Sequence, residues 1–244
     1  MKKTLTLAKR NAKEILRDPL TLIFGLGFPL VLLLLLSAIQ ASIPVPLFEI
    51  ASLAPGITVF GLSFMTLFSA TLIAKDRGSA LLQRLYTAPL RPVDFILGYT
   101  LPVLPFAVAQ CAICYAVALA LGLAPSWNIL LAILFILPSA LLFVALGLLF
   151  GSILTDKQVG GICGALLTNL TAWLSGVWFD LSLVGGAFET IAHLLPFVHA
   201  VELSRAVLAG SLSGAVSHLL WVLGYALAAL LLSVVLFLRQ MKRQ

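Results

Sequence analysis

Four side chains that could bind a metal ion or exchange protons stand near one another in the sequence: Glu189, His193, His199 and Glu202. Glu189 and His193 are spaced i, i+4, and Glu202 and Arg205 are spaced i, i+3, so each pair would share one face of a helix. A zinc site needs more ligands than this spacing supplies. We therefore predict structural pairing and no metal site, while an intramembrane enzyme built on Glu189, His193 and His199 stays the catalytic alternative.

The elements that must position these residues are apolar helices of membrane-spanning length. Hydrophobic residues make up 61% of the 244-residue chain and charged residues only 10%, which is unlike a soluble domain. The apolar runs are continuous and do not alternate with polar residues, so the pattern indicates an all-α membrane protein and not a barrel. Six spans are predicted at about 20–39, 53–74, 95–121, 129–151, 159–179 and 215–238.

The distribution of Lys and Arg predicts the orientation of these spans. Basic residues concentrate on the cytoplasmic side of short loops. With the N-terminus inside, every Lys and Arg except Arg205 falls on the cytoplasmic side, and both termini are cytoplasmic. The formal net charge of +6 is then a matter of topology and of contact with anionic membrane lipids. We expect no nucleic-acid partner, because no motif supports one.

The segment 1–19 has the pattern of an amphipathic interfacial helix, ahead of a single transmembrane domain at 20–244. Asp18 and Pro19 would end this helix. The alternative is a charged tail that only fixes orientation. On a helical wheel the apolar side holds Leu5, Ala8, Ala12, Ile15 and Leu16, and the opposite side holds Arg10, Lys13, Glu14 and Arg17.

A charged island, "AKDRGSALLQRLYTAPLRP", separates the second and third predicted spans. Ser79 could cap a short amphipathic helix from Ala80 to about Tyr86, and Pro89 would stop it. A rigid element joined to the ends of two spans would pass a displacement to both of them. Any partner that moves it must lie in the cytosol.

The island and a second motif resemble the ABC-2 type membrane subunits of ATP-binding cassette exporters. The first motif is "LLQRLYTAPL", Leu81–Leu90, and the second is "LLPFVHAVELSRAVLAG", Leu194–Gly210, which precedes the last span. The resemblance covers nearly the whole chain, including the amphipathic start and six spans. It implies that the island is the coupling helix that docks on an ATPase subunit, with contacts from Ser79, Leu81, Leu82, Arg84, Leu85 and Pro89.

The resemblance also implies partners, location and direction. The working unit would hold two ATP-binding cassette ATPase subunits and two permease subunits, either a homodimer or a pair of related permeases. ATP and Mg²⁺ would bind the ATPase, with no cofactor in this chain, which carries no G-x-x-x-x-G-K-[ST] loop. Transport would run outward across a bacterial or archaeal inner membrane.

Polar residues inside the predicted spans are candidates for a substrate path, because polar groups at membrane depth are costly and often functional. The alternative is that they serve helix packing. No ionised side chain lies deep in a span, which favours a hydrophobic or amphiphilic cargo such as a drug or lipid. A self-contained secondary transporter or channel would need such charges, or broken helices in two matching halves. The path candidates are Thr66, Ser69, Gln110, Asn169, Trp173 and Ser175.

The stretch from Asp180 to Gly214 is too long for a hairpin and too apolar for a simple exterior loop. We predict re-entrant or interfacial helices broken at Pro196. In the predicted topology these helices lie at the outer side, so Glu189, His193, His199, Glu202 and Arg205 would form an extracellular gate.

Overall fold

The protein is described by a computed structural model that covers residues 2–79 and 92–241. Every regular element in these ranges is a helix. The predicted coupling helix, from Ala80 to about Tyr86, lies outside the described residues, and with it Leu81, Leu82, Arg84, Leu85 and Pro89. In chain order the elements are α1 (Lys2–Arg17), α2 (Pro19–Leu22), η1 (Ile23–Gly27), α3 (Phe28–Ser42), α4 (Ile50–Gly78), α6 (Pro92–Thr100), α7 (Val103–Ala120), α8 (Asn128–Ile153), α9 (Asp156–Val159), η2 (Gly160–Leu167), α10 (Thr168–Leu174), η3 (Leu181–Leu183), α11 (Gly186–Leu194), α12 (Pro196–Leu208) and α13 (Leu212–Met241).

Five helical stretches within the described residues are long and apolar enough to cross a membrane. The pair α11 and α12, bent by 76° at the break before Pro196, would be a sixth if it counts as one span. This break agrees with the prediction, since proline cannot continue a helix. The five stretches are Pro19–Ser42, Ile50–Gly78, Val93–Ala120, Asn128–Ile153 and Leu212–Leu236.

The predicted span 159–179 is not one of these five. It is helical from α9 through η2 to α10, from Asp156 to Leu174, and so ends earlier than predicted. Gly176 then adopts φ +69, a conformation that glycine reaches without strain and that turns the chain away. Polar residues at the start and in the middle, such as Gln158 and Asn169, make this stretch less apolar than the other spans.

Helix α4 lies at the centre of the bundle, since 89% of the residues in its 18-residue apolar stretch are buried. It packs on α8 at two glycines: a Cβ on Gly147 would lie 2.7 Å from the main-chain oxygen of Thr66, and one on Gly151 would lie 2.7 Å from that of Ala70. Small residues let helix backbones approach closely in a membrane bundle. Thr66 Oγ1 also donates to Phe143 O across this contact, at 2.7 Å.

The spans Pro19–Ser42 and α13 are peripheral. Only 22% of the residues in the 18-residue apolar stretch of each are buried. Their exposed residues are large and apolar, among them Val31, Leu35, Leu220 and Leu231. Such faces would contact lipid tails or another apolar protein surface, because their exposure to water is unfavourable.

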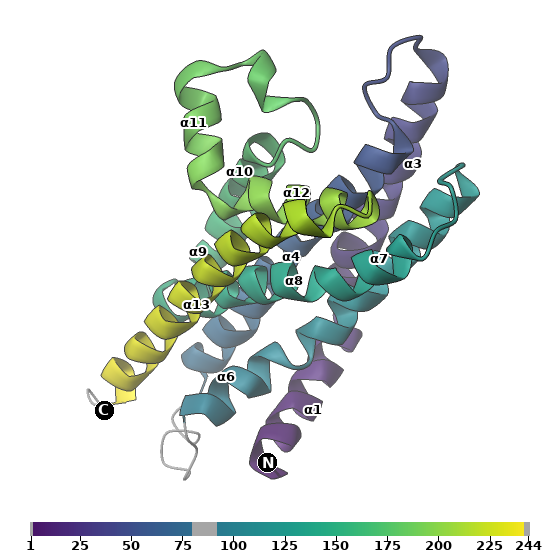
Figure 1. Ribbon diagram of the computed structural model, residues 1–244. Helices are drawn as coiled ribbons and strands as arrows, with labels where there is room; N and C mark the ends of the chain where they lie inside the picture. Colours follow the sequence, from purple (N-terminus) through teal and green to yellow (C-terminus); the bar gives the residue numbers. More distant parts are fainter. Residues whose placement is uncertain (1, 80–91, 242–244) are drawn as a thin grey trace.

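Figure 1 shows that the two ends of the described chain lie at the same end of the bundle. Helix α1, the end of α4 and the start of α6 gather there, which we call the foot. The α3–α4 connection, the α7–α8 connection and α11 lie at the opposite end. The chain therefore has two distinct ends, and residues far apart in the sequence meet at each of them.

Candidate functional site

Helix α1 builds the foot; the segment is helical, as predicted, and its position at the membrane interface stays a prediction. It packs on α6, where Gly98 leaves no room for more than hydrogen: a Cβ there would lie 2.5 Å from Leu7 Cδ2. Asn11 Nδ2 donates to Gly98 O at 3.0 Å, and Thr4 Oγ1 donates to Asp94 Oδ1 at 2.5 Å. Asp18 then caps α2 by accepting from Leu20 N, so the chain turns where predicted.

The face that α1 buries against the protein shares Ala8 and Ile15 with the predicted apolar side but is shifted toward Asn11. Leu5 and Leu16 are exposed, whereas Asn11 is fully buried. Arg10, expected on the outer side, turns inward. The wheel ranks faces by hydrophobicity, but here the shape of α6 and the hydrogen bond to Gly98 select the buried one. That face is formed by Thr4, Leu7, Ala8, Asn11 and Ile15.

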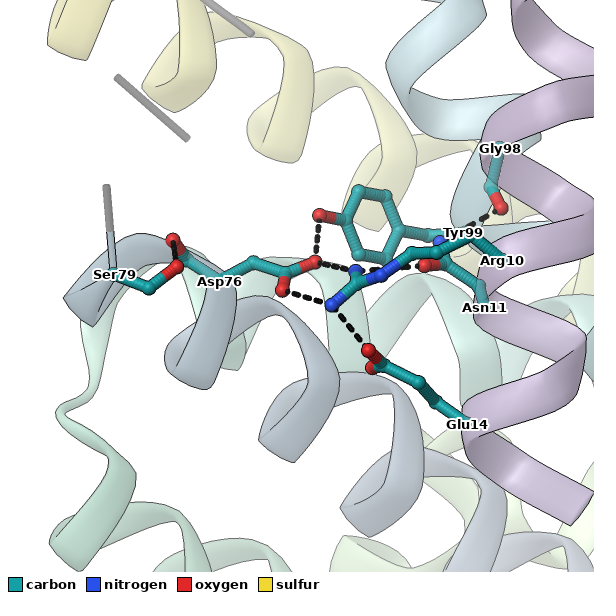
Figure 2. Close-up of polar contacts among 7 residues, drawn as sticks. All are labelled: Arg10, Asn11, Glu14, Asp76, Ser79, Gly98 and Tyr99. Atoms are coloured by element: carbon teal, nitrogen blue, oxygen red, sulfur yellow. Dashed lines mark hydrogen bonds and ion pairs between the residues drawn. The ribbon is translucent and has the colours of Figure 1, made fainter. Parts of the chain in front are cut away.

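Arg10 joins α1 to the last full turn of α4 (Figure 2). Its guanidinium donates to both carboxylate oxygens of Asp76, with 2.8 Å from Nη2 to Oδ1, and it also pairs with Glu14 on its own helix. Tyr99 of α6 donates its hydroxyl to Asp76 Oδ2 at 2.6 Å. We call Arg10, Asn11, Glu14, Asp76 and Tyr99 the foot cluster; three helices meet in it.

The electrostatics of the foot cluster depend on the burial of Asp76, whose side chain is 4% exposed. A buried carboxylate is stable only when it is paired and hydrogen-bonded. Two-pronged contact with arginine and a tyrosine hydroxyl supply both. Partial burial lowers the pKa of Arg10, but the hydrogen bonds and charge of Asp76 outweigh this effect and raise it above its ordinary value. Arg10 therefore stays charged at any physiological pH.

Other contacts fix the end of α4 in place. Ser79 ends the helix, and its backbone N and Oγ donate to Asp76 O at 3.3 Å and 2.9 Å. Arg77 donates to the main-chain oxygens of Gly151, Ile153 and Leu154, where α8 ends. Cationic side chains favourably meet the free carbonyls at helix C-termini. Helices α1, α4, α6 and α8 are therefore tied together on both sides of segment 80–91.

Sequence reasoning singled out Ser79 at the foot but missed Asp76 and Tyr99. An acidic residue at the C-terminal end of a span opposes the helix dipole, and this was the available signal that Asp76 must have a cationic partner. The identity of that partner could not follow from spacing, because Arg10 lies on a different helix.

The predicted substrate-path residues divide into two groups. Thr66, Ser69, Gln110 and Ser175 are buried inside the described chain, and their part in a substrate path stays a prediction. Asn169 and Trp173 are exposed on α10, although Asn169 Nδ2 donates to Ala165 O at 2.8 Å. Of these six residues, only the second pair lies at the surface of the described chain.

The predicted gate residues gather at the end opposite the foot. Arg205 pairs with Glu202 at 2.9 Å, as the i, i+3 spacing predicts, and donates to Gly176 O at 2.9 Å. His199 contacts His218 of α13 at 2.9 Å between Nδ1 atoms and His193 O at 3.0 Å. Glu189 and His193 line a cavity together with Glu202 and Arg205. Within the described residues no three His, Cys, Asp or Glu side chains are arranged to hold a metal ion.

Comparison with known proteins identifies the family of this chain. A search of curated proteins found no match. The family model described as ABC-2 type transporter matches residues 2–209, which include α1, the foot cluster and the bent pair α11–α12. Since this match covers most of the chain, the protein belongs to the ABC-2 type transporter family and is a membrane component of an ATP-binding cassette transporter.

Proposed function

We propose that this chain is the permease subunit of an exporter and moves a hydrophobic or amphiphilic molecule outward with ATP hydrolysed by a separate ATPase. The foot is the cytoplasmic end in this proposal. Lys75 and Arg77 lie in the last turn of α4, and Lys157 lies in α9, which follows the end of α8 that Arg77 contacts, while Arg205 lies in α12; this division fits the preference of basic residues for the cytoplasmic side.

The observation that carries the proposal is the attachment of the foot cluster to both sides of segment 80–91. Asp76 precedes this segment and Tyr99 follows it; a hydrogen bond joins the two side chains, and Asp76 also pairs with Arg10 of α1. A force applied to the segment therefore reaches α4 and α6 together, and α1 moves with them. An ATPase that docks on the segment would in this way drive the centre of the bundle, because α4 is its most buried helix.

Two copies of the chain with two ATPase subunits form the proposed working unit. The weakly buried spans Pro19–Ser42 and α13 provide apolar faces for the second permease. The exposed Asn169 and Trp173 are the proposed substrate contacts among the predicted set. Segment 80–91 is the proposed docking element, with Ser79, Leu81, Leu82, Arg84, Leu85 and Pro89 contacting the ATPase.

The test replaces Leu82 or Leu85 with Asp in the complete complex. Loss of an apolar anchor at an interface costs about 2 kcal/mol, so the affinity for the ATPase should fall roughly 30-fold. Co-purification and the ATPase rate in lipid vesicles measure this loss. Leu121→Asp is the matched control, because Leu121 is exposed in the α7–α8 connection at the opposite end. Unchanged co-purification and an unchanged ATPase rate in both the Leu82→Asp and the Leu85→Asp variants would refute the docking role.

A further inference from the structure

A cavity of about 350 Å³ lies at the end opposite the foot. Its walls come from the α3–α4 connection, the start of α4, the loop after α10, and helices α11 and α12. Cavities of this size hold small organic ligands. Three carboxylates line it, those of Asp180, Glu189 and Glu202, and the cationic lining residue in the cavity is Arg205.

Arg205 is already committed to fixed acceptors. Its guanidinium donates to Glu202 Oε1 at 2.9 Å, to Gly176 O at 2.9 Å and to Ser52 O at 3.3 Å. These contacts neutralise Glu202 and hold three walls of the cavity together. They also use three of the five N–H donors of the guanidinium, which leaves fewer for an anionic ligand. The cavity is therefore poorly suited to bind an anion.

Asp180 and Glu189 supply the charge that remains. Asp180 accepts from Ser182 N at 3.0 Å, and this hydrogen bond lowers the pKa of its carboxyl, which stays ionised. Glu189 is half-buried in the first turn of α11, where a negative charge is favoured by the helix dipole. With Arg205 and Glu202 paired, these two carboxylates give the cavity an excess of negative charge.

Aromatic rings form the apolar part of the lining. Phe48, Trp178 and Phe179 face the cavity. Trp178 packs edge-on against Phe60 at 5.4 Å between ring centroids, and Phe179 packs against Trp173 at 6.0 Å. These neighbours hold the rings in position. Aromatic faces attract cations, and most strongly where water is partly excluded.

We propose that this cavity binds a monovalent organic cation with an apolar body. Aromatic rings and unneutralised carboxylates recognise the charge, while the apolar walls recognise the body. The inference rests on the proposed function only where the cavity is taken as a substrate-binding site at the outer end of the exporter. Binding itself does not depend on the ATPase.

The test uses the purified full chain in neutral detergent and two probes of nearly equal shape and opposite charge, tetraphenylphosphonium and tetraphenylborate. Binding is measured by equilibrium dialysis. We expect saturable binding of tetraphenylphosphonium and no saturable binding of tetraphenylborate. The double variant Asp180→Asn, Glu189→Gln should raise the Kd for tetraphenylphosphonium about tenfold. Asp156→Asn is the control, because Asp156 is exposed on α9 and does not line the cavity.

Three results would overturn the inference: no saturable tetraphenylphosphonium binding, equal binding of both probes, or an unchanged Kd in a folded double variant. Thermal unfolding of that variant verifies its fold. The outcome is separable from that of the proposed function. Cation binding in a chain that needs no ATPase would leave the cavity assignment standing, and an ATPase-coupled chain without cation binding would leave only the export proposal.

Discussion

Arg10 and Arg205 lie at opposite ends of the bundle, and their side chains are 34% and 23% exposed. Their partners differ in kind. Arg10 reaches the carboxylate of another helix, Asp76 on α4, whereas Arg205 bonds to the main chain at Ser52 and Gly176 and to a carboxylate of its own helix. Arg10 thus joins two helices through a carboxylate, whereas Arg205 joins the elements around it through main-chain oxygens.

The difference has consequences for movement and for charge. Side-chain pairs between helices can separate when the helices shift, so they suit a place where a displacement enters the bundle. Main-chain acceptors carry no net charge, so an arginine bound to them leaves nearby carboxylates unneutralised. The foot cluster uses its acidic groups internally, and the far cavity keeps two of them for a ligand.

The largest expected effect comes from Asp76→Asn. This change removes the charge that Arg10 pairs with in a buried setting, and we expect a loss of about 2 kcal/mol in unfolding free energy. The corresponding change at the other end, Glu202→Gln, affects a half-exposed pair within one helix and should cost less than about 1 kcal/mol. Unfolding in mixed detergent micelles compares the two. Equal losses would contradict the distinction between the two ends.

A smaller effect is expected from Tyr99→Phe, with Tyr225→Phe as its matched control. Both hydroxyls donate at 2.6 Å, but Tyr99 is buried and donates to a carboxylate, whereas Tyr225 is exposed and donates to Leu194 O. We expect losses of about 1.5 kcal/mol and about 0.5 kcal/mol in unfolding free energy. A readout beyond stability is the ATPase rate of the complex, which only the Tyr99 variant should reduce.

The smallest effect concerns pH at the cavity. Hydrogen bonding to Ser182 lowers the pKa of Asp180 in the folded protein below its ordinary value of 3.8. A lowered pKa means that this contact contributes stability above the ordinary value and loses it as the pH falls through the folded value. The midpoint of thermal unfolding should therefore decline slightly less on acidification in Asp180→Asn than in the unchanged protein. A steeper decline in the variant would reverse the assigned sign.

Much of the local structure could be predicted because its causes are local. Asp18 and Pro19 end α1, and Pro196 separates α11 from α12, as the proline rules require. The Glu202–Arg205 pair follows from i, i+3 spacing. The two motifs also predicted the family, which the match over residues 2–209 confirms. The coupling role of Leu82 and its neighbours stays a prediction.

The sequence could not decide what depends on packing. The wheel placed Leu5 and Leu16 on the apolar side of α1 together with Ala8 and Ile15, but only the last two are buried against the protein, because contact with α6 selects a face shifted toward Asn11. Polarity at membrane depth singled out Gln110 and Asn169 alike, although one is buried in the bundle and the other lies on its surface. Composition cannot separate these cases, since both residues stand in apolar surroundings in the sequence.

The sequence by itself determined the helices, their breaks and the membrane class, because hydrophobicity, proline and capping act over a few neighbouring residues. Only the tertiary structure decided which charges meet. Arg10, Asp76 and Tyr99 come from three helices, and their contact requires the close approach of α1 to α6 at Gly98. Such a meeting depends on the shapes of whole helices, which no local pattern encodes.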